Sequence, residues 1–180
     1  MNLNAAHLHI MLNHIPVFGS LFAALLIAWG LLRKSEDVLR LGLALAFVVG
    51  IATWGVQLTG EPAEEVIENL AGVSRRMIHA HEEAAEWATY LIAAAGVLGL
   101  VALLLVRRRH RAARGLSLLT LLVSLVGFAA VSRAALLGGE IRHPEARSDF
   151  VAPAEGGEHE GARPEGQPTP QPAGQPGGGG

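Results

Sequence analysis

Four long apolar runs dominate the hydrophobicity pattern of this chain. They cover roughly residues 8–32, 41–58, 84–106 and 115–137, and each is rich in Leu, Ala, Val and Gly. A helix needs about 20 apolar residues to cross the hydrocarbon core of a bilayer, and the second run is close to the shortest that suffices. The pattern therefore predicts an all-α integral membrane protein in which residues 1–145 form a four-helix bundle.

The segments that connect the runs differ in charge. The first connection, Arg33–Arg40, and the third, Arg107–Arg114, together hold eight of the fourteen basic residues. Cytoplasmic loops are enriched in Lys and Arg, so both are predicted to face the cytoplasm. The N-terminus, the acidic middle segment 59–83 and the C-terminal segment would then lie on the periplasmic or outer side of a bacterial cytoplasmic membrane. A short helix is predicted in the middle segment, beginning near Pro62.

The composition agrees with a membrane protein. Hydrophobic residues make up 51% of the chain and charged residues only 17%, whereas soluble domains carry about 25% charged residues. No Lys or Arg precedes Arg33, so the first run is predicted to be a retained helix and not a cleaved signal peptide. Residues 146–180 are rich in Pro and Gly, which predicts a disordered external tail. The net charge of −2 and the lack of a basic stripe argue against a nucleic acid partner.

Most of the histidines are predicted to lie on one side of the membrane. Three segments contribute them: the start of the first run, the approach to the third and the exit from the fourth. Segments that converge at one depth are how helix bundles build cofactor and metal sites. The chain has no cysteine, so any metal must be held by His, Asp, Glu or backbone groups. The six histidines concerned are His7, His9, His14, His79, His81 and His143.

Helical spacing ranks the histidines of the first run. His7 and His14 are seven residues apart and share a helix face, whereas His9 points elsewhere. We therefore expect His14 to face the interior of the bundle. His7 and His143 are the second choices for such a position.

The same reasoning applies before the third run. His79 shares a face with Glu82, Glu83 and Glu86, and His81 lies nearly opposite His79. We therefore expect His79 to be the inward-facing histidine of this segment. A site at this level would then combine imidazole and carboxylate groups from different helices.

Two ionisable residues are predicted to lie within the spans. Glu86 falls about one turn into the third run, and Arg133 lies just before the outer end of the fourth. Such groups are expensive in lipid and usually pair or serve a function, so an ion pair between them is expected, with a helix-end anchor as the alternative for Arg133. Trp54, Trp87 and Tyr90 are placed as an aromatic belt would be.

These residues are compatible with three functions. In the first, His14 and His79 ligate the iron of haem b for electron transfer, and Arg133 pairs with a propionate. In the second, the outer face binds Zn, Cu, Ni or Fe in the divalent state. In the third, the protein is a non-catalytic subunit of a larger membrane complex, or a homo-oligomer. The metal ligands would come from His7, His9, His14, His79, His81, Glu83, Glu86 and His143.

An enzyme is not predicted. The sequence HEEAA at residues 81–85 differs from the H-E-x-x-H motif of zinc proteases, because position 85 is alanine. The chain also has no phosphate-binding Gly-rich loop and no nucleophilic serine motif. The histidines are therefore interpreted as ligands rather than as catalytic groups.

Four short motifs suggest a relationship to a known family. They are HLHIMLNHIP at residues 7–16, LTGEPAEE at 58–65, IHAHEEAAEW at 78–87 and LLGGEIRH at 136–143. As a set, over residues 5–145, they resemble the bacterial membrane proteins of the domain of unknown function 2231 family. This resemblance implies a four-helix membrane fold and selects the same histidines, but it implies no established activity. The Pro/Gly-rich tail departs from the family pattern.

Overall fold

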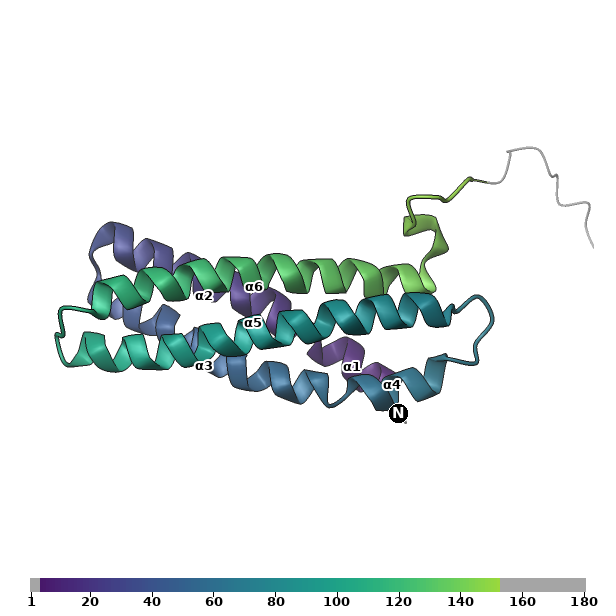
Figure 1. Ribbon diagram of the computed structural model, residues 1–180, viewed down its shortest axis with the longest axis horizontal. Helices are drawn as coiled ribbons and strands as arrows, with labels where there is room; N and C mark the ends of the chain where they lie inside the picture. The colour runs from purple at the N-terminus through teal and green to yellow at the C-terminus, as the bar shows by residue number, and fades with distance from the viewer. Residues whose placement is uncertain (1–3, 153–180) are drawn as a thin grey trace, which may run out of the picture. The chain divides into compact units, whose positions relative to one another are not determined.

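Within residues 4–152, which the computed structural model describes, the chain forms six α-helices and no strand (Figure 1). The all-α prediction is therefore confirmed. The predicted tail lies outside the described residues from position 153 onward. The elements are α1 (Ala5–Leu12), α2 (His14–Arg33), α3 (Glu36–Gln57), α4 (Gly60–Ile67), α5 (Arg75–Arg107), α6 (Ala113–Arg142) and the short 3-10 helix η1 (Pro144–Ala146).

Four helical segments are long and apolar enough to cross a membrane. Two of them are formed by consecutive helices, α1 with α2 over Ala5–Arg33 and α3 with α4 over Glu36–Ile67, and the others are α5 and α6. The four predicted apolar runs lie inside these segments, but the helices are longer. In particular, α5 begins at Arg75 rather than near residue 84, because the polar stretch that carries the histidines continues the helix beyond its apolar part.

Two prolines explain why the first two spans are interrupted. Pro16 has no N–H to donate to the carbonyl of Leu12, and Pro62 has none for the carbonyl of Leu58. The helices break at these points, so that α1 ends at Leu12 and α3 ends at Gln57. The short helices beyond the breaks, α1 and α4, pack mainly on each other. The short helix predicted near Pro62 is thus confirmed as α4.

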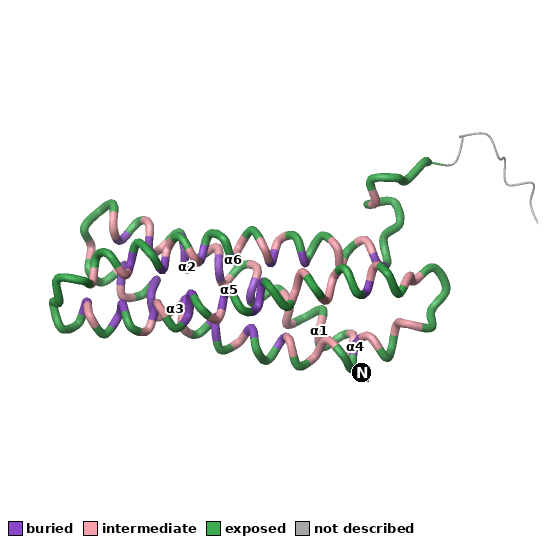
Figure 2. Tube along the Cα trace, in the orientation of Figure 1, coloured by how far each residue is buried: buried purple, intermediate pink, exposed green. Residues whose placement is uncertain are grey.

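The bundle is packed with small residues inside and large apolar residues outside. Figure 2 shows the buried positions along the facing sides of the long helices. The interior contains many Ala, Gly, Ser and Thr residues, such as Ala23, Ala46, Ala95, Gly96 and Ala102. Large side chains such as Leu25, Trp29, Leu41, Val97 and Leu122 are exposed. This is the arrangement of helices that approach closely while lipid covers their apolar outer surface, so the protein is a membrane protein.

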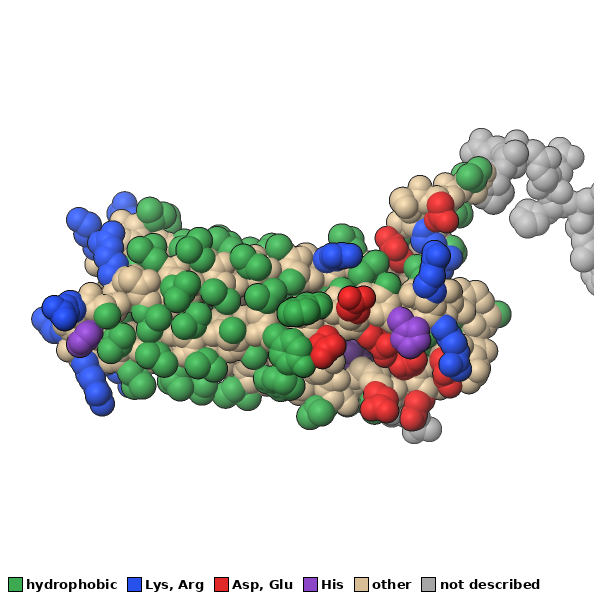
Figure 3. Space-filling view, in the orientation of Figure 1, with side chains coloured by type: hydrophobic (Ala, Val, Ile, Leu, Met, Phe, Trp, Pro, Cys, Tyr) green, Lys and Arg blue, Asp and Glu red, His purple; other side chains and the backbone are tan. Residues whose placement is uncertain are grey.

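Charge separates the two ends of the bundle. Figure 3 shows an apolar band, with Lys and Arg side chains clustered at one end and most of the visible Asp and Glu, together with further Lys and Arg, at the other. The basic end is formed by the turn between α2 and α3 and the turn between α5 and α6. The start of α1, the start of α5 and the end of α6 lie at the opposite end, which we call the histidine end. The two basic connections therefore lie together, as expected.

The close helix packing makes a testable prediction at Gly42. A Cβ atom at this position would lie 2.7 Å from the backbone nitrogen of Ile27, whereas one at Gly55, also in α3, would meet nothing within 4 Å. We expect Gly42→Ala to lower the free energy of unfolding by about 1–3 kcal/mol because α2 must move. Gly55→Ala should leave it unchanged or raise it by up to about 1 kcal/mol, because alanine favours a helix over glycine. Reversible unfolding in mixed micelles, followed by circular dichroism, measures both; equal effects would contradict this packing.

Candidate functional site

Two histidines from different spans face each other at the histidine end. The ring centroids of His9 in α1 and His81 in α5 are 6.5 Å apart, and the ring planes are nearly perpendicular at 89°. Both side chains are half-buried. A pair of imidazoles from separate helices is thus brought together at the end of the bundle that the sequence identified.

Hydrogen bonds fix the tautomer of both neutral rings. The hydroxyl of Thr59 donates to the carbonyl of Val56 at 2.6 Å, so it accepts a hydrogen bond from Nδ1–H of His9, at 2.8 Å. The carbonyl of Ala134, which can only accept, lies 2.8 Å from Nδ1 of His81. The proton of each neutral ring is therefore on Nδ1, and Nε2 carries a lone pair. Metal-binding histidines usually have this arrangement, in which a second hydrogen bond orients the ring.

Glycines lie beside both rings. A Cβ atom at Gly138 in α6 would lie 3.0 Å from Cε1 of His81, and one at Gly60 would lie 3.9 Å from Cε1 of His9. Any side chain at position 138 would therefore press on the His81 ring. The His81 ring can pack on α6 because Gly138 has no side chain and because the ring is hydrogen-bonded to the carbonyl of Ala134.

The predicted orientation in the first span is wrong: His9 faces inward and His14 does not. His14 is exposed, donates from Nδ1 to the carbonyl of Ile10 at 2.9 Å and stacks on Phe18 with ring centroids 6.1 Å apart. The prediction assumed one continuous helix from His7 to His14. The helix is interrupted at Asn13, between the two histidines, and His7 is exposed like His14.

The orientation predicted for the third span is also reversed. His79 is exposed, and its Nδ1 lies 3.1 Å from a carboxylate oxygen of Glu82, in agreement with their shared face. His81 instead continues the buried face of α5, because it precedes the buried residues Ala88 and Ala95 at seven-residue intervals. This stripe of small residues was the signal in the sequence that identifies His81.

Two further histidines bind near neighbours instead of the pair. His7 is exposed, with Nδ1 2.8 Å from the amide oxygen of Asn4, and His143 has Nδ1 2.9 Å from a carboxylate oxygen of Glu145. The backbone N–H of Glu145 and the His143 ring hold the pKa of the Glu145 carboxyl below its usual value. Neither histidine is brought into contact with His9 or His81.

The ion pair expected within the spans is not formed. Glu86 accepts a hydrogen bond from the hydroxyl of Tyr90 at 2.8 Å, and Arg133 is exposed and has no ion pair with any described residue. The aromatic residues do gather at one level, since the Tyr90 ring lies 6.1 Å from that of Trp54 and 6.4 Å from that of Trp87. Glu86 thus belongs to an aromatic group on the outer surface.

The full set of predicted metal ligands does not converge. Among the side chains of residues 4–152, no three His, Asp or Glu groups are placed to hold one metal ion. Glu83, for example, is exposed. The structure instead offers two imidazoles, His9 and His81, as the only pair of histidine rings found in contact within that range.

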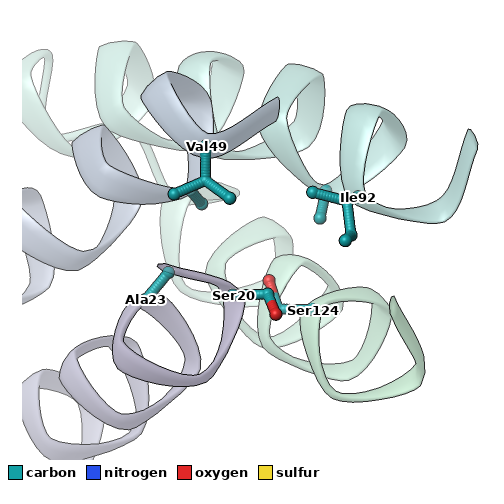
Figure 4. A pocket seen from close by; sticks show the side chains of 7 residues that line it. Ser20, Ala23, Val49, Ile92 and Ser124 are labelled. Carbon is teal, nitrogen blue, oxygen red and sulfur yellow. The ribbon is translucent and has the colours of Figure 1, made fainter. Parts of the chain in front are cut away.

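A small cavity lies in the middle of the bundle, and its lining includes neither histidine of the pair. It has a volume of about 10 Å³ and includes Ser20 and Ser124 in its lining, whose side chains point toward the same space (Figure 4). The Ser20 hydroxyl donates to the carbonyl of Val17 at 3.2 Å. The Ser124 hydroxyl is buried and has no hydrogen-bond partner among the described residues.

This unpaired hydroxyl makes a second prediction. A buried hydroxyl without a partner costs about 1–3 kcal/mol, so Ser124→Ala should raise the unfolding temperature. The matched control is Ser117→Ala, also buried in α6, whose hydroxyl donates to the carbonyl of Ala113 at 2.8 Å and which should give no gain. Thermal unfolding in detergent compares the two. A larger loss for Ser124→Ala than for Ser117→Ala would show that the Ser124 hydroxyl has a partner.

Comparison with known proteins adds no assignment. No protein-family model, no curated protein and no solved structure matches this chain. The function is therefore inferred from the residues themselves. Among these, the facing pair of His9 and His81 is the arrangement with the clearest chemistry.

Proposed function

We propose that this protein is a metal-binding protein of the bacterial cytoplasmic membrane that ligates a transition metal through Nε2 of His9 and His81, and that the metal is the iron of haem b. The observation that carries the proposal is the facing pair of imidazoles, each with Nδ1–H engaged by a protein acceptor. The motif resemblance to bacterial four-helix membrane proteins of the domain of unknown function 2231 family supports the membrane location alone, because it implies no established activity.

The distance between the rings suits a shared metal. Imidazole nitrogens bind such metals at about 2.0–2.1 Å, so two rings on opposite sides of one metal have centroids roughly 6 Å apart. The His9 and His81 centroids are 6.5 Å apart. The spacing of the two rings is therefore compatible with one metal ion between them.

The number of ligands favours haem over a bare ion. A zinc ion held only by protein usually takes four ligands, and three suitable side chains do not converge within residues 4–152. Haem iron receives four nitrogens from the porphyrin and needs only two ligands from the protein, a role that His9 and His81 would fill. When bound, haem would provide one-electron transfer at a potential set by these ligands and their surroundings.

The flat ring of haem would require α1 and α4 to shift away from α5. These short helices pack mainly on each other, and a break near a proline separates each from its long helix, so a joint shift of α1 and α4 would leave the packing among the four long helices intact. Arg133 immediately precedes Ala134, whose carbonyl orients His81. It therefore remains the proposed partner of a haem propionate.

The absorption spectrum of the protein purified in mild detergent tests this proposal. We expect a Soret band that shifts on reduction. His9→Ala and His81→Ala should each remove most of it, because each deletes one of two axial ligands. His14→Ala and His79→Ala are the matched controls, because each removes an exposed histidine from the same region of the chain as His9 or His81. Both should leave the spectrum unchanged.

The alternatives give different results in the same experiment. If the protein is colourless but contains a divalent metal, and the His9 and His81 variants lose that metal, then the two ligands are correct and the bound group is a metal ion instead of haem. A colourless, metal-free protein that folds normally and takes up neither haem nor metal would rule out the proposal. If only the His14 and His79 variants lose the Soret band, then the ligands are His14 and His79, as helical spacing predicted, and the proposed pair is wrong.

The proposed orientation has its own test, which the absence of native cysteine makes simple. Glu61 at the histidine end and Ala112 at the basic end are both exposed. In intact spheroplasts, a membrane-impermeant maleimide should label Glu61→Cys. It should label Ala112→Cys only after lysis, because the basic turns are cytoplasmic. The opposite labelling pattern would place the histidine pair in the cytoplasm.

A further inference from the structure

The basic end of the bundle contains an open cleft that plays no part in the proposed metal site. It has a volume of about 440 Å³ and lies between the turn that joins α2 to α3 and the turn that joins α5 to α6. Sites for small ligands commonly have volumes of about 300–1,000 Å³. The floor includes the aliphatic residues Leu39 and Val106, and the polar lining includes Lys34, Ser35, Arg109, His110, Arg111 and Arg114.

The cations of this cleft lack acidic partners. Lys34, Arg109, Arg111 and Arg114 form no ion pair with any carboxylate of residues 4–152. The acidic residue in the lining, Glu36, is already 2.7 Å from Arg40. Four positive charges therefore line one cavity against the single carboxylate of Glu36, so an anion that enters the cavity is attracted to it.

The backbone gives an independent indication that the cations matter. Lys34 has φ = 55° and Arg109 has φ = 52°, which is the left-handed region that favours glycine. Each occupies its turn near the C-terminal end of a long helix. Two separate turns thus hold a long cationic side chain at positions where glycine would fit the backbone better, and both side chains line the same cleft.

His110 adds a neutral donor to the cleft. The backbone N–H of Ala112 donates to Nδ1 of His110 at 3.1 Å, so the proton of the neutral ring lies on Nε2 and can be donated to a ligand. The cleft therefore combines cations, an N–H donor and an aliphatic floor. Phosphate oxygens accept hydrogen bonds of this kind and carry the matching charge.

The depth of the cleft also fits a phosphate at the membrane surface. Trp29, one helical turn before Arg33, is exposed, and its ring lies 5.6 Å from the guanidinium carbon of Arg33. Tryptophan in this setting marks the level of the lipid headgroups. Basic pockets between helices at this level bind the phosphates of anionic lipids.

We propose that this cleft binds a phosphate-ester anion, with Lys34, Arg109, Arg111 and Arg114 as the charged ligands. The phosphate can belong to an anionic lipid headgroup or to a soluble phosphate compound, because both present the same oxygens. The proposal is independent of the metal site, since the cleft lies at the other end of the bundle and shares no residue with it.

The test uses the full chain in neutral detergent with three probes: phosphatidylglycerol, phosphatidylcholine and inorganic phosphate. The double variant Lys34→Gly with Arg109→Gly removes two cations while suiting the left-handed backbone, so it should fold at least as stably as the parent. The control is Arg33→Ala with Arg108→Ala, which removes two charges from the same turns but not from the cleft lining. Binding is measured from the concentration dependence of thermal stabilisation.

We expect phosphatidylglycerol to stabilise the parent and the control, and phosphatidylcholine to have no effect. The glycine variant should bind phosphatidylglycerol about thirtyfold more weakly. If inorganic phosphate stabilises the parent equally well and this effect is lost in the glycine variant, the ligand is a soluble phosphate compound and the site still stands. Equal weakening in both double variants, or no anion effect on the parent, would overturn the proposal.

Discussion

The close approach of helix backbones at small residues is the constraint on which the rest of this structure depends. In lipid there is no hydrophobic gain from burying leucine, so helices associate through close packing at Gly and Ala. A Cβ atom on Gly50 of α3 would lie 3.0 Å from the Cα atom of Gly96 in α5. This contact helps to set the rotation of α5, and the buried face it defines runs on to His81. The position of a polar residue at the end of the helix thus follows from packing in its apolar middle.

Two prolines separate short helices from the closely packed bundle. Pro16 and Pro62 each interrupt a span at the histidine end, so the first and second spans end in short helices that are partly independent of the bundle. The break in the first span separates His9 from the helix that follows it, and the break in the second places Thr59 where its hydroxyl accepts a hydrogen bond from His9. One side of the histidine pair is therefore held by the long helix α5 and the other by the short helices α1 and α4.

Much of this fold could be predicted from the sequence, because run length and charge placement act locally. The four spans, the common end of the basic turns and the gathering of histidines at the other end all follow from such local signals. The choice between His9 and His14, or between His79 and His81, depends on how each helix is rotated toward its neighbours. For α5 the heptad of small residues through Ala88 and Ala95 contained that information. For α1 the helix is interrupted before Pro16, between His9 and His14. A comparison of helix faces over seven residues assumes an unbroken helix, so it could not make this choice.

The length of α5 has a consequence for access to the histidine pair. At about 1.5 Å per residue the 33 residues of this helix extend for about 50 Å, whereas the hydrocarbon core is about 30 Å thick. Trp87 and Tyr90 mark the level at which the apolar part ends, and His81 lies about 9 Å farther along the helix than Trp87. The pair would then stand above the lipid, within reach of water-soluble molecules. A soluble donor or acceptor of electrons or metal would meet it directly, without a path through the membrane.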